Sequence, residues 1–105
     1  MNPLDLAKIK DGRLLLVIGN FLYRQGASYF MSKQGLNADI AKNAQSALEL
    51  AEKNDYKLVV TEIEIPAPKD GIYLIKELQK RKPKLEVLIV SFAKSILKLA
   101  ETQNG

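Results

Sequence analysis

The sequence contains no cysteine, no histidine and no tryptophan. Without cysteine there is no disulfide bond or thiolate metal site, and without histidine as well any metal ion would have to be held by oxygen atoms. The longest apolar runs, LLLVI and VLIV, are far shorter than the ~20 residues of a membrane-spanning helix. The first residues, MNPLDLAKIKDG, lack the charged-then-apolar order of a secretion signal. These absences exclude zinc and thiol chemistry and predict a cytoplasmic protein without a membrane segment.

Acidic residues are outnumbered by basic ones, 12 to 16, and the formal net charge is +4. The densest basic cluster is KELQKRKPK, residues 76–84. Cations are favoured near a helix C-terminus, so a solvated helix end explains most of this cluster. A binding groove for single-stranded nucleic acid would need aromatic residues among the cations, and this cluster contains none. A small basic nucleic-acid-binding module is therefore only an alternative function, and nucleic acid is not the expected partner.

Four β-rich runs recur along the 105 residues, a length that fits one domain. They cover residues 13–18, 37–41, 57–63 and 85–91. The first, third and fourth are nearly continuous Leu, Val and Ile, which is typical of strands buried on both faces of a parallel sheet. The second run is half polar, so it is predicted to lie at an edge of the sheet.

Helical patterns fill the gaps between these runs. The first helix is predicted to have an apolar face formed by Leu22, Gly26, Ala27 and Phe30, with Gly35 ending the segment. The second follows the N-cap residue Asn43, and its inner face is formed by Ala44, Ala47, Leu48 and Ala51. The third is predicted to begin after Asp70, to bury Gly71, Leu74, Ile75 and Leu78, and to end before Pro83. A weaker fourth helix is expected over residues 95–102.

Alternation of strands and helices predicts an α/β fold, in which a parallel sheet carries helices on both faces through right-handed crossovers. In such sheets, functional groups collect at the carboxyl ends of the strands. This rule places residues 18–20, Glu62 and Ser91 along one rim of the sheet. They are the candidate site residues.

Three segments give the chain a resemblance to a known family: NAQSALELAEKNDYKLVVTEIEIP, the following DG with its helix, and VLIVSFA. The chain resembles the receiver domain of two-component response regulators. The resemblance implies a flavodoxin-like, three-layer α/β/α fold with strand order 2-1-3-4. It also implies a receiver-like domain over residues 13–105, which is expected to stop before the fifth strand and its lysine, preceded by an N-terminal extension over residues 1–12.

The resemblance also assigns roles to the candidate site residues. Glu62 takes the position of the aspartate that receivers phosphorylate, and Ser91 takes that of the hydroxyl that follows the phosphoryl group. The acidic pair that holds Mg²⁺ in the family corresponds to Ile18 and Gly19, with Asn20 beside them, so no carboxylate is available there. The pattern implies a degenerate receiver with no metal and no cofactor.

The predicted function is therefore that of a non-catalytic pseudo-receiver, a regulatory or protein-interaction module that lacks normal aspartyl phosphorylation. Its expected partner is a kinase-related or output protein, together with a second copy of the chain bound through the fourth strand and fourth helix. The first alternative is a fragment of a phosphorylatable receiver. An enzyme is not expected, because VIGNF offers no phosphate-binding glycine motif and no nucleophile lies in a pattern with a base.

Overall fold

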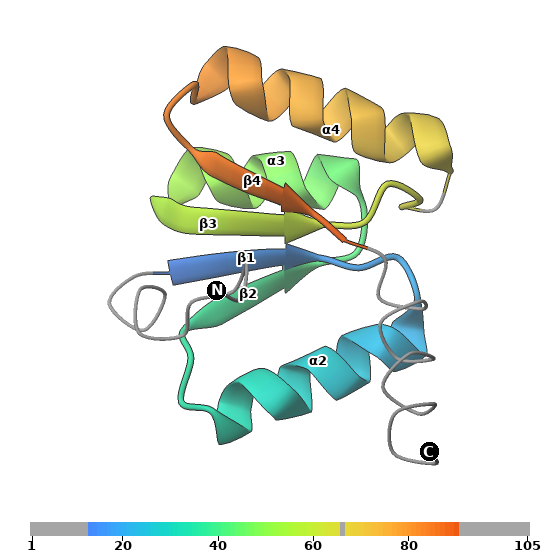
Figure 1. Ribbon diagram of the computed structural model, residues 1–105, viewed down its shortest axis with the longest axis vertical. Coiled ribbons are helices and arrows are strands. Elements are labelled where there is room, and N and C mark those ends of the chain that lie inside the picture. The colour runs from blue at the N-terminus through green and yellow to red at the C-terminus, as the bar shows by residue number, and fades with distance from the viewer. Residues whose placement is uncertain (1–12, 66, 91–105) are drawn as a thin grey trace, which may run out of the picture.

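The computed structural model of the chain describes residues 13–65 and 67–90 (Figure 1). Within them the elements alternate in the order β1 (Arg13–Val17), α2 (Phe21–Lys33), β2 (Ala38–Ala41), α3 (Ala44–Lys53), β3 (Tyr56–Thr61), α4 (Pro68–Arg81) and β4 (Glu86–Ile89). The expected extension over residues 1–12, the expected helix over 95–102 and Ser91 lie outside the described residues. None of the described helices is long and apolar enough to cross a membrane.

The four described strands form one parallel sheet in the order β2-β1-β3-β4, which confirms the predicted fold and strand order. Leu16 on the central strand β1 pairs with Ile40 of β2 on one side and with Val60 of β3 on the other. The half-polar second strand lies at the edge, as predicted. Because all four strands run in the same direction, their carboxyl ends share one rim of the sheet (Figure 1).

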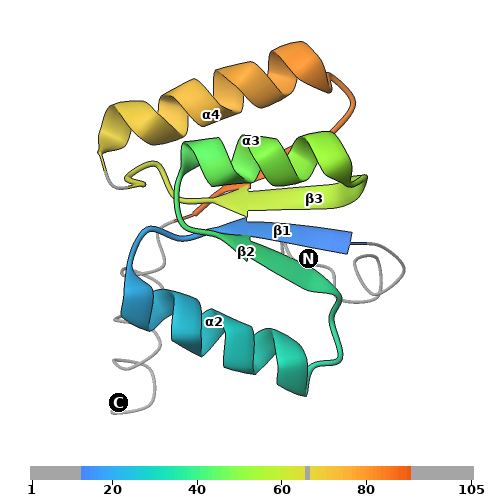
Figure 2. The same cartoon turned by 180° about the vertical axis from the view of Figure 1, so that it is seen from behind.

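Two apolar cores lie on opposite faces of the sheet, and alternate residues of each strand enter one or the other. Leu15, Val17 and Val59 pack with α3 and α4, whereas Leu14, Leu16 and Val60 pack toward α2. Figure 2 shows the resulting layers from behind, with α2 on one side of the sheet and α3 and α4 on the other. The near-continuous apolar runs of β1 and β3 are therefore required by burial on both faces.

The start of α3 agrees with the prediction, and the start of α4 does not. Asn43 caps α3, because its Oδ1 accepts a hydrogen bond from the Ser46 N–H at 2.8 Å. Helix α4 begins at Pro68, ahead of Asp70, since proline suits the first turn of a helix. The Asp70 carboxylate lies inside that first turn, where it accepts the Ala67 N–H at 3.0 Å.

The predicted inner face of α2 is correct for Ala27 and wrong for the rest. Leu22 and Phe30 are 73% and 49% exposed and Gly26 is exposed, whereas Tyr23 and Met31 pack against the core together with Ala27. These three residues are also spaced at i, i+4 and i+8, so two neighbouring faces of this helix have apolar periodicity. The structure packs Tyr23, Ala27 and Met31 toward the sheet and leaves Leu22 and Phe30 exposed. At its C-terminal end, Gly35 has a positive φ of 68°, as the predicted stop requires.

Strand β4 is less buried than its apolar sequence predicted. Glu86 is exposed and Ile89 is 48% exposed, whereas Val87 and Leu88 are half-buried. Among the described residues, β4 has a strand neighbour on one side only, which is β3. The expectation of full burial on both faces is therefore wrong for this strand.

Candidate functional site

The carboxyl-end rim brings Glu62 close to the loop that follows β1. Backbone pairing continues past the strand ends, with the Glu62 N–H donating to the Val17 carbonyl at 3.2 Å. The half-buried Glu62 side chain turns toward β1, where its Oε1 accepts the Gly19 N–H at 3.3 Å. Two of the predicted site positions are thus in direct contact, although they are 43 residues apart in the sequence.

The other two positions of this loop have structural roles. Ile18 is fully buried in the core on the α2 side of the sheet. Asn20 is the N-cap of α2, and its Oδ1 accepts the Tyr23 N–H at 3.1 Å. The side chain of Asn20 therefore satisfies a free helix N–H group, and Ile18 contributes apolar burial.

Arg24 completes the site, and the sequence analysis did not identify it. Its Nη1 donates to the carbonyl oxygens of Ile18 at 3.0 Å and Gly19 at 2.9 Å. The guanidinium carbon also lies 5.8 Å from the centroid of the Phe21 ring. A signal was available in the sequence, because a cation near the start of a helix is disfavoured by the helix dipole unless it has another role.

Glu62 and Arg24 hold the same peptide group from opposite sides. The N–H of the Ile18–Gly19 peptide binds the Glu62 carboxylate, and the C=O of that peptide binds the Arg24 guanidinium. We call this arrangement the peptide clamp. Hydrogen bonds to ionised groups are stronger than neutral ones, and charges at both ends of one peptide polarise it in the same sense. The clamp fixes the loop between β1 and α2.

The residues at this rim do not suit the Mg²⁺ that the receiver fold implies. Mg²⁺ needs oxygen ligands in near-octahedral geometry, usually including one or two carboxylates. A side chain at Gly19 would be tightly placed, since its Cβ would lie 3.3 Å from the Cα of Ile65. Across the described ranges, no three acidic, histidine or cysteine side chains gather in a way that could hold a metal ion. Glu62 Oε1 accepts a peptide N–H of the loop, that of Gly19.

A second polar cluster lies at the opposite, amino end of the sheet. Asp39 Oδ2 accepts hydrogen bonds from Arg13 Nη2 and from the Tyr56 hydroxyl, both at 2.6 Å. Arg13 Nη1 also donates to Asn54 Oδ1, and its guanidinium lies over the Tyr56 ring at 5.6 Å. Burial of Tyr56, followed by its hydrogen bond to Asp39, raises the pKa of this phenol above its usual value. We call these four residues the amino-end network.

Comparisons with solved structures give the fold relatives. The chain is similar to the chemotaxis response regulator CheY4 of Vibrio cholerae, at 19% identity and a TM-score of 0.65 over 73% of this chain and 65% of that one. It is similar to the receiver domain of NtrX from Brucella abortus, at 27% identity and a TM-score of 0.65 over 72% of this chain and 64% of that one. It is also similar to a chain in the complex of histidine kinase ThkA with response regulator protein TrrA, at 26% identity and a TM-score of 0.65. The match covers 73% of this chain and 66% of that one.

The chain spans 65% of the length of CheY4 and 18% of a longer NtrX chain. No curated protein sequence is significantly similar to it. The family model of the response regulator receiver domain matches residues 14–103, which is most of the chain. With the parallel sheet in the order β2-β1-β3-β4 and the carboxyl-end rim in place, this match shows that the chain belongs to the response regulator receiver domains, the regulatory modules of two-component signalling.

Proposed function

We propose that this chain is a pseudo-receiver, a regulatory module that works through protein contacts and without aspartyl phosphorylation. The observation that carries the proposal is the peptide clamp, in which Glu62 and Arg24 bind the Ile18–Gly19 peptide. In this arrangement, the chain's own side chains satisfy the rim at which a receiver would hold its metal ion. The clamp gives the module one fixed loop conformation in place of two that a phosphoryl group could switch.

The chemistry of Glu62 supports this proposal. Phosphoryl transfer to a carboxylate needs an oxygen in line with the donor phosphorus and a cation that neutralises the developing charge. Glu62 has one methylene more than aspartate, and misplacement by about 1 Å can cost roughly 100-fold in rate. One of its carboxylate oxygens already accepts the Gly19 N–H. Arg24 is the nearby cation, but its Nη1 is directed at backbone carbonyls.

Intact-mass spectrometry tests this proposal against the alternative of a phosphorylatable receiver. The protein is incubated with Mg²⁺ and acetyl phosphate, with an active receiver in the same tube to show that the donor works. We expect no mass gain of one phosphoryl group on this chain. A stoichiometric gain that disappears in Glu62→Gln would establish the alternative, whereas a gain that survives this substitution would place the phosphoryl group elsewhere.

The protein-binding surface that we infer is the outer face of α2. Four large apolar side chains are exposed there: Phe21, Leu22, Tyr29 and Phe30. Contiguous exposed apolar side chains on a protein surface often mark a site of interaction with another protein. The similar chain in the ThkA–TrrA structure comes from a complex of a kinase with a response regulator. A kinase-related or output protein is therefore the partner class that we assign to this face.

We also infer a homodimer formed through β4 and the segment that follows it. Among the described residues, the far edge of β4 has no strand neighbour, and Ile89 on this strand is exposed. Exposed edge strands are templates for pairing with another chain, and two-fold pairing is the commonest closed arrangement.

Light scattering on a sizing column is expected to give twice the chain mass, and Ile89→Lys is expected to restore one chain mass. Leu22→Lys on α2 is the matched control and should leave the dimer intact. A single-chain mass for the unmodified protein at all concentrations would refute the dimer.

A further inference from the structure

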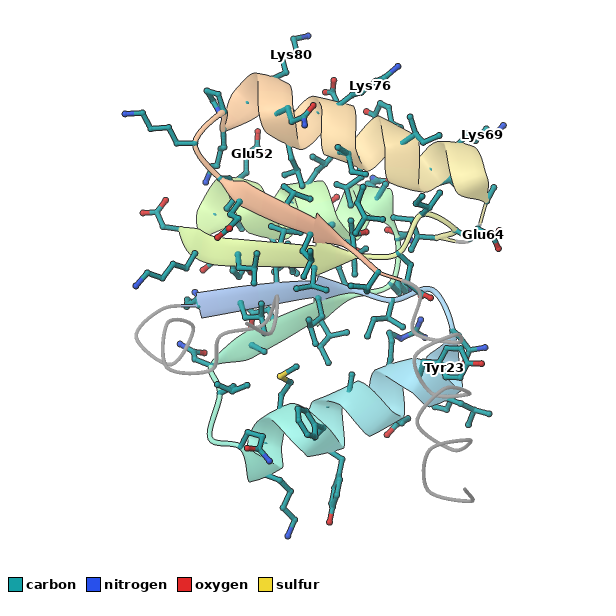
Figure 3. The ribbon with its side chains drawn as sticks, viewed as in Figure 1. Tyr23, Glu52, Glu64, Lys69, Lys76 and Lys80 are labelled. Atoms are coloured by element: carbon teal, nitrogen blue, oxygen red, sulfur yellow. The ribbon has the colours of Figure 1, made fainter. Side chains whose placement is uncertain are left out.

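Helix α4 has a basic stripe on the face opposite the core. Lys69, Tyr73, Lys76 and Lys80 are spaced at i, i+4, i+7 and i+11, so at 100° per residue they fall within a sector of about 60°. The buried residues Gly71, Leu74 and Leu78 occupy the opposite side of the helix. Figure 3 shows Lys69, Lys76 and Lys80 directed away from the sheet on the outer side of α4. The stripe is the face of this helix that is furthest from the core.

The lysines of this stripe differ from Arg81 and Lys82 in having no ion-pair partner within the described residues. Arg81 binds Glu77 at 3.0 Å, and Lys82 donates to the Asn54 carbonyl at 3.2 Å and lies 3.7 Å from Asp55. Throughout the described part of the chain, no carboxylate forms an ion pair with any lysine of the stripe. Like charges four residues apart destabilise a helix, so Lys76 and Lys80 repel each other, and this cost is offset only in part by Glu77 three residues before Lys80 and by the position of Lys80 in the last turn.

Tyr73 interleaves this stripe, a feature that the linear cluster at residues 76–84 does not show. The ring is 52% exposed and lies between Lys69 and Lys76 along the helix. The stripe from Lys69 to Lys80 is about 16 Å long at the α-helical rise of 1.5 Å per residue. Cations that follow a backbone, together with an aromatic ring on which a base can stack, are the elements that recognise single-stranded nucleic acid without sequence preference.

We propose that the outer face of α4 binds single-stranded nucleic acid, with Lys69, Lys76 and Lys80 on phosphate groups and Tyr73 stacked on an unpaired base. A lipid surface fits the stripe less well. A helix that binds in a membrane interface buries its apolar face there, whereas the apolar face of α4 is already buried in the protein core through Leu74 and Leu78. The net charge of +4 favours association with a polyanion in general. This inference concerns α4 and does not rest on the peptide clamp.

Fluorescence anisotropy with a labelled oligothymidylate of about 16 nucleotides, the upper end of common site sizes, tests the proposal on the full chain. Three phosphate contacts predict a slope of about −2 for log K against log salt concentration, and each single Lys→Gln substitution should reduce its magnitude by about 0.7. Sequence-independent binding of this kind has a dissociation constant of about 10⁻⁴ M at physiological salt, so the titration is done at low salt. The triple substitution of Lys69, Lys76 and Lys80 to Gln should weaken binding about tenfold or more.

A charge-matched control separates the stripe from bulk charge. Lys42, Lys53 and Lys57 are exposed and lie outside α4, so their triple substitution to Gln removes the same charge. We expect it to retain more than half of the binding constant at the same salt concentration. Equal loss in both triple variants would overturn the proposal. Thermal melts of all variants confirm that they fold, which is expected because every substituted lysine is exposed.

Two further outcomes decide the class of ligand. Tyr73→Leu should weaken oligothymidylate binding about fivefold or more, and Tyr73→Phe should retain it, because stacking needs the ring and not the hydroxyl. No effect of Tyr73→Leu, or equal binding of a duplex, would contradict the single-strand assignment. Binding to phosphatidylserine vesicles with no binding to the oligonucleotide would overturn the proposal and assign the stripe to a lipid surface.

Discussion

The two ends of the same parallel sheet use polar side chains in different ways. At the amino end, the side chains of Arg13, Asp39 and Tyr56 bind one another across three strands. At the carboxyl end, Glu62 and Arg24 bind the backbone of a single loop. Side-chain contacts between strands hold strands together, whereas side-chain contacts with a loop fix its conformation. We therefore expect the side chains of the amino-end network to act mainly on stability, and those of the peptide clamp to act mainly on the conformation of the rim.

The carboxyl end also contains a close contact between two backbone segments. The loop after β3 passes directly against the first turns of α4, where the Gly71 N–H donates to the Ile63 carbonyl at 2.9 Å. A Cβ atom at Gly71 would lie 2.1 Å from this same oxygen, so only glycine allows the approach. This backbone contact positions the segment that carries Glu62, whereas the amino-end network is made of side-chain contacts.

The largest expected effect comes from filling that contact. Gly71→Ala should lower the free energy of unfolding by about 3 kcal/mol, the upper range for overpacking, because the added methyl group meets backbone atoms. Gly26→Ala is the matched control, since a Cβ there has nothing within 4 Å, and it should stabilise α2 by about 1 kcal/mol. Urea denaturation measures both. A Gly71→Ala protein as stable as the parent would show that the loop near Glu62 is free to move.

The amino-end network should show the next largest effect. Asp39→Ala leaves Arg13 and the Tyr56 hydroxyl without their shared acceptor, and we expect a loss of about 2 kcal/mol in the free energy of unfolding. Asp55→Ala is the control, because Asp55 is fully exposed and lies 3.7 Å from Lys82. Thermal and urea unfolding should detect no change in this control. Equal effects for the two substitutions would mean that the network adds nothing beyond surface charge.

The dependence of stability on alkaline pH should also distinguish the amino-end network from the carboxyl-end rim. The folded pKa of Tyr56 is raised, so the unfolded chain loses this proton first, at a pH of about 10. The stabilisation is therefore complete below about pH 10 and is lost as the pH rises from there toward the folded pKa, at up to about 1.4 kcal/mol per pH unit. Tyr56→Phe should lack this component of the alkaline decline. Parallel stability curves for the parent and Tyr56→Phe above pH 10 would contradict the raised pKa.

The peptide clamp should have the smallest effect on global stability. Arg24→Leu and Glu62→Ala should each cost about 1 kcal/mol, and the two losses should not add, because both side chains hold the Ile18–Gly19 peptide. Arg81→Leu, which removes an exposed pair with Glu77, is the control and should cost less than 0.5 kcal/mol. A double-mutant cycle by urea denaturation measures the coupling. Strict additivity would show that Glu62 and Arg24 act independently.

The sequence correctly predicted the strands and helices whose apolar pattern has only one interpretation. Continuous apolar runs identified β1 and β3, and the apolar face of α3 was predicted correctly because, apart from the half-buried Leu50, every other position of this helix is polar. Apart from Ala27, the inner face of helix α2 was predicted wrongly, since Leu22 and Phe30 have the same apolar periodicity as Tyr23 and Met31. Only the tertiary fit of α2 against the sheet distinguishes these faces, and sequence spacing does not contain that information.

The candidate site was predicted in part. The rule that strand carboxyl ends meet placed Glu62 near Gly19, and the structure brings them into contact. Arg24 was missed because its acceptors are backbone carbonyls, which no sequence pattern identifies, and the one available signal, a cation near a helix start, does not name its partners. The basic stripe on α4 was missed for another reason: the linear cluster at residues 76–84 excluded Lys69 and Tyr73, which share its face only once the helix is formed.

We propose that the peptide clamp closes the carboxyl-end rim, so that Glu62 does not take up a phosphoryl group. The most direct test follows the backbone amide signals of Gly19 and Glu62 by ¹H–¹⁵N NMR while Mg²⁺ is added, first alone and then with beryllofluoride, which mimics an acyl phosphate. We predict no saturable shift of either signal, because a peptide bond and not a carboxylate pair occupies this part of the rim. A saturable shift of the Gly19 amide that disappears in Glu62→Gln would contradict the account.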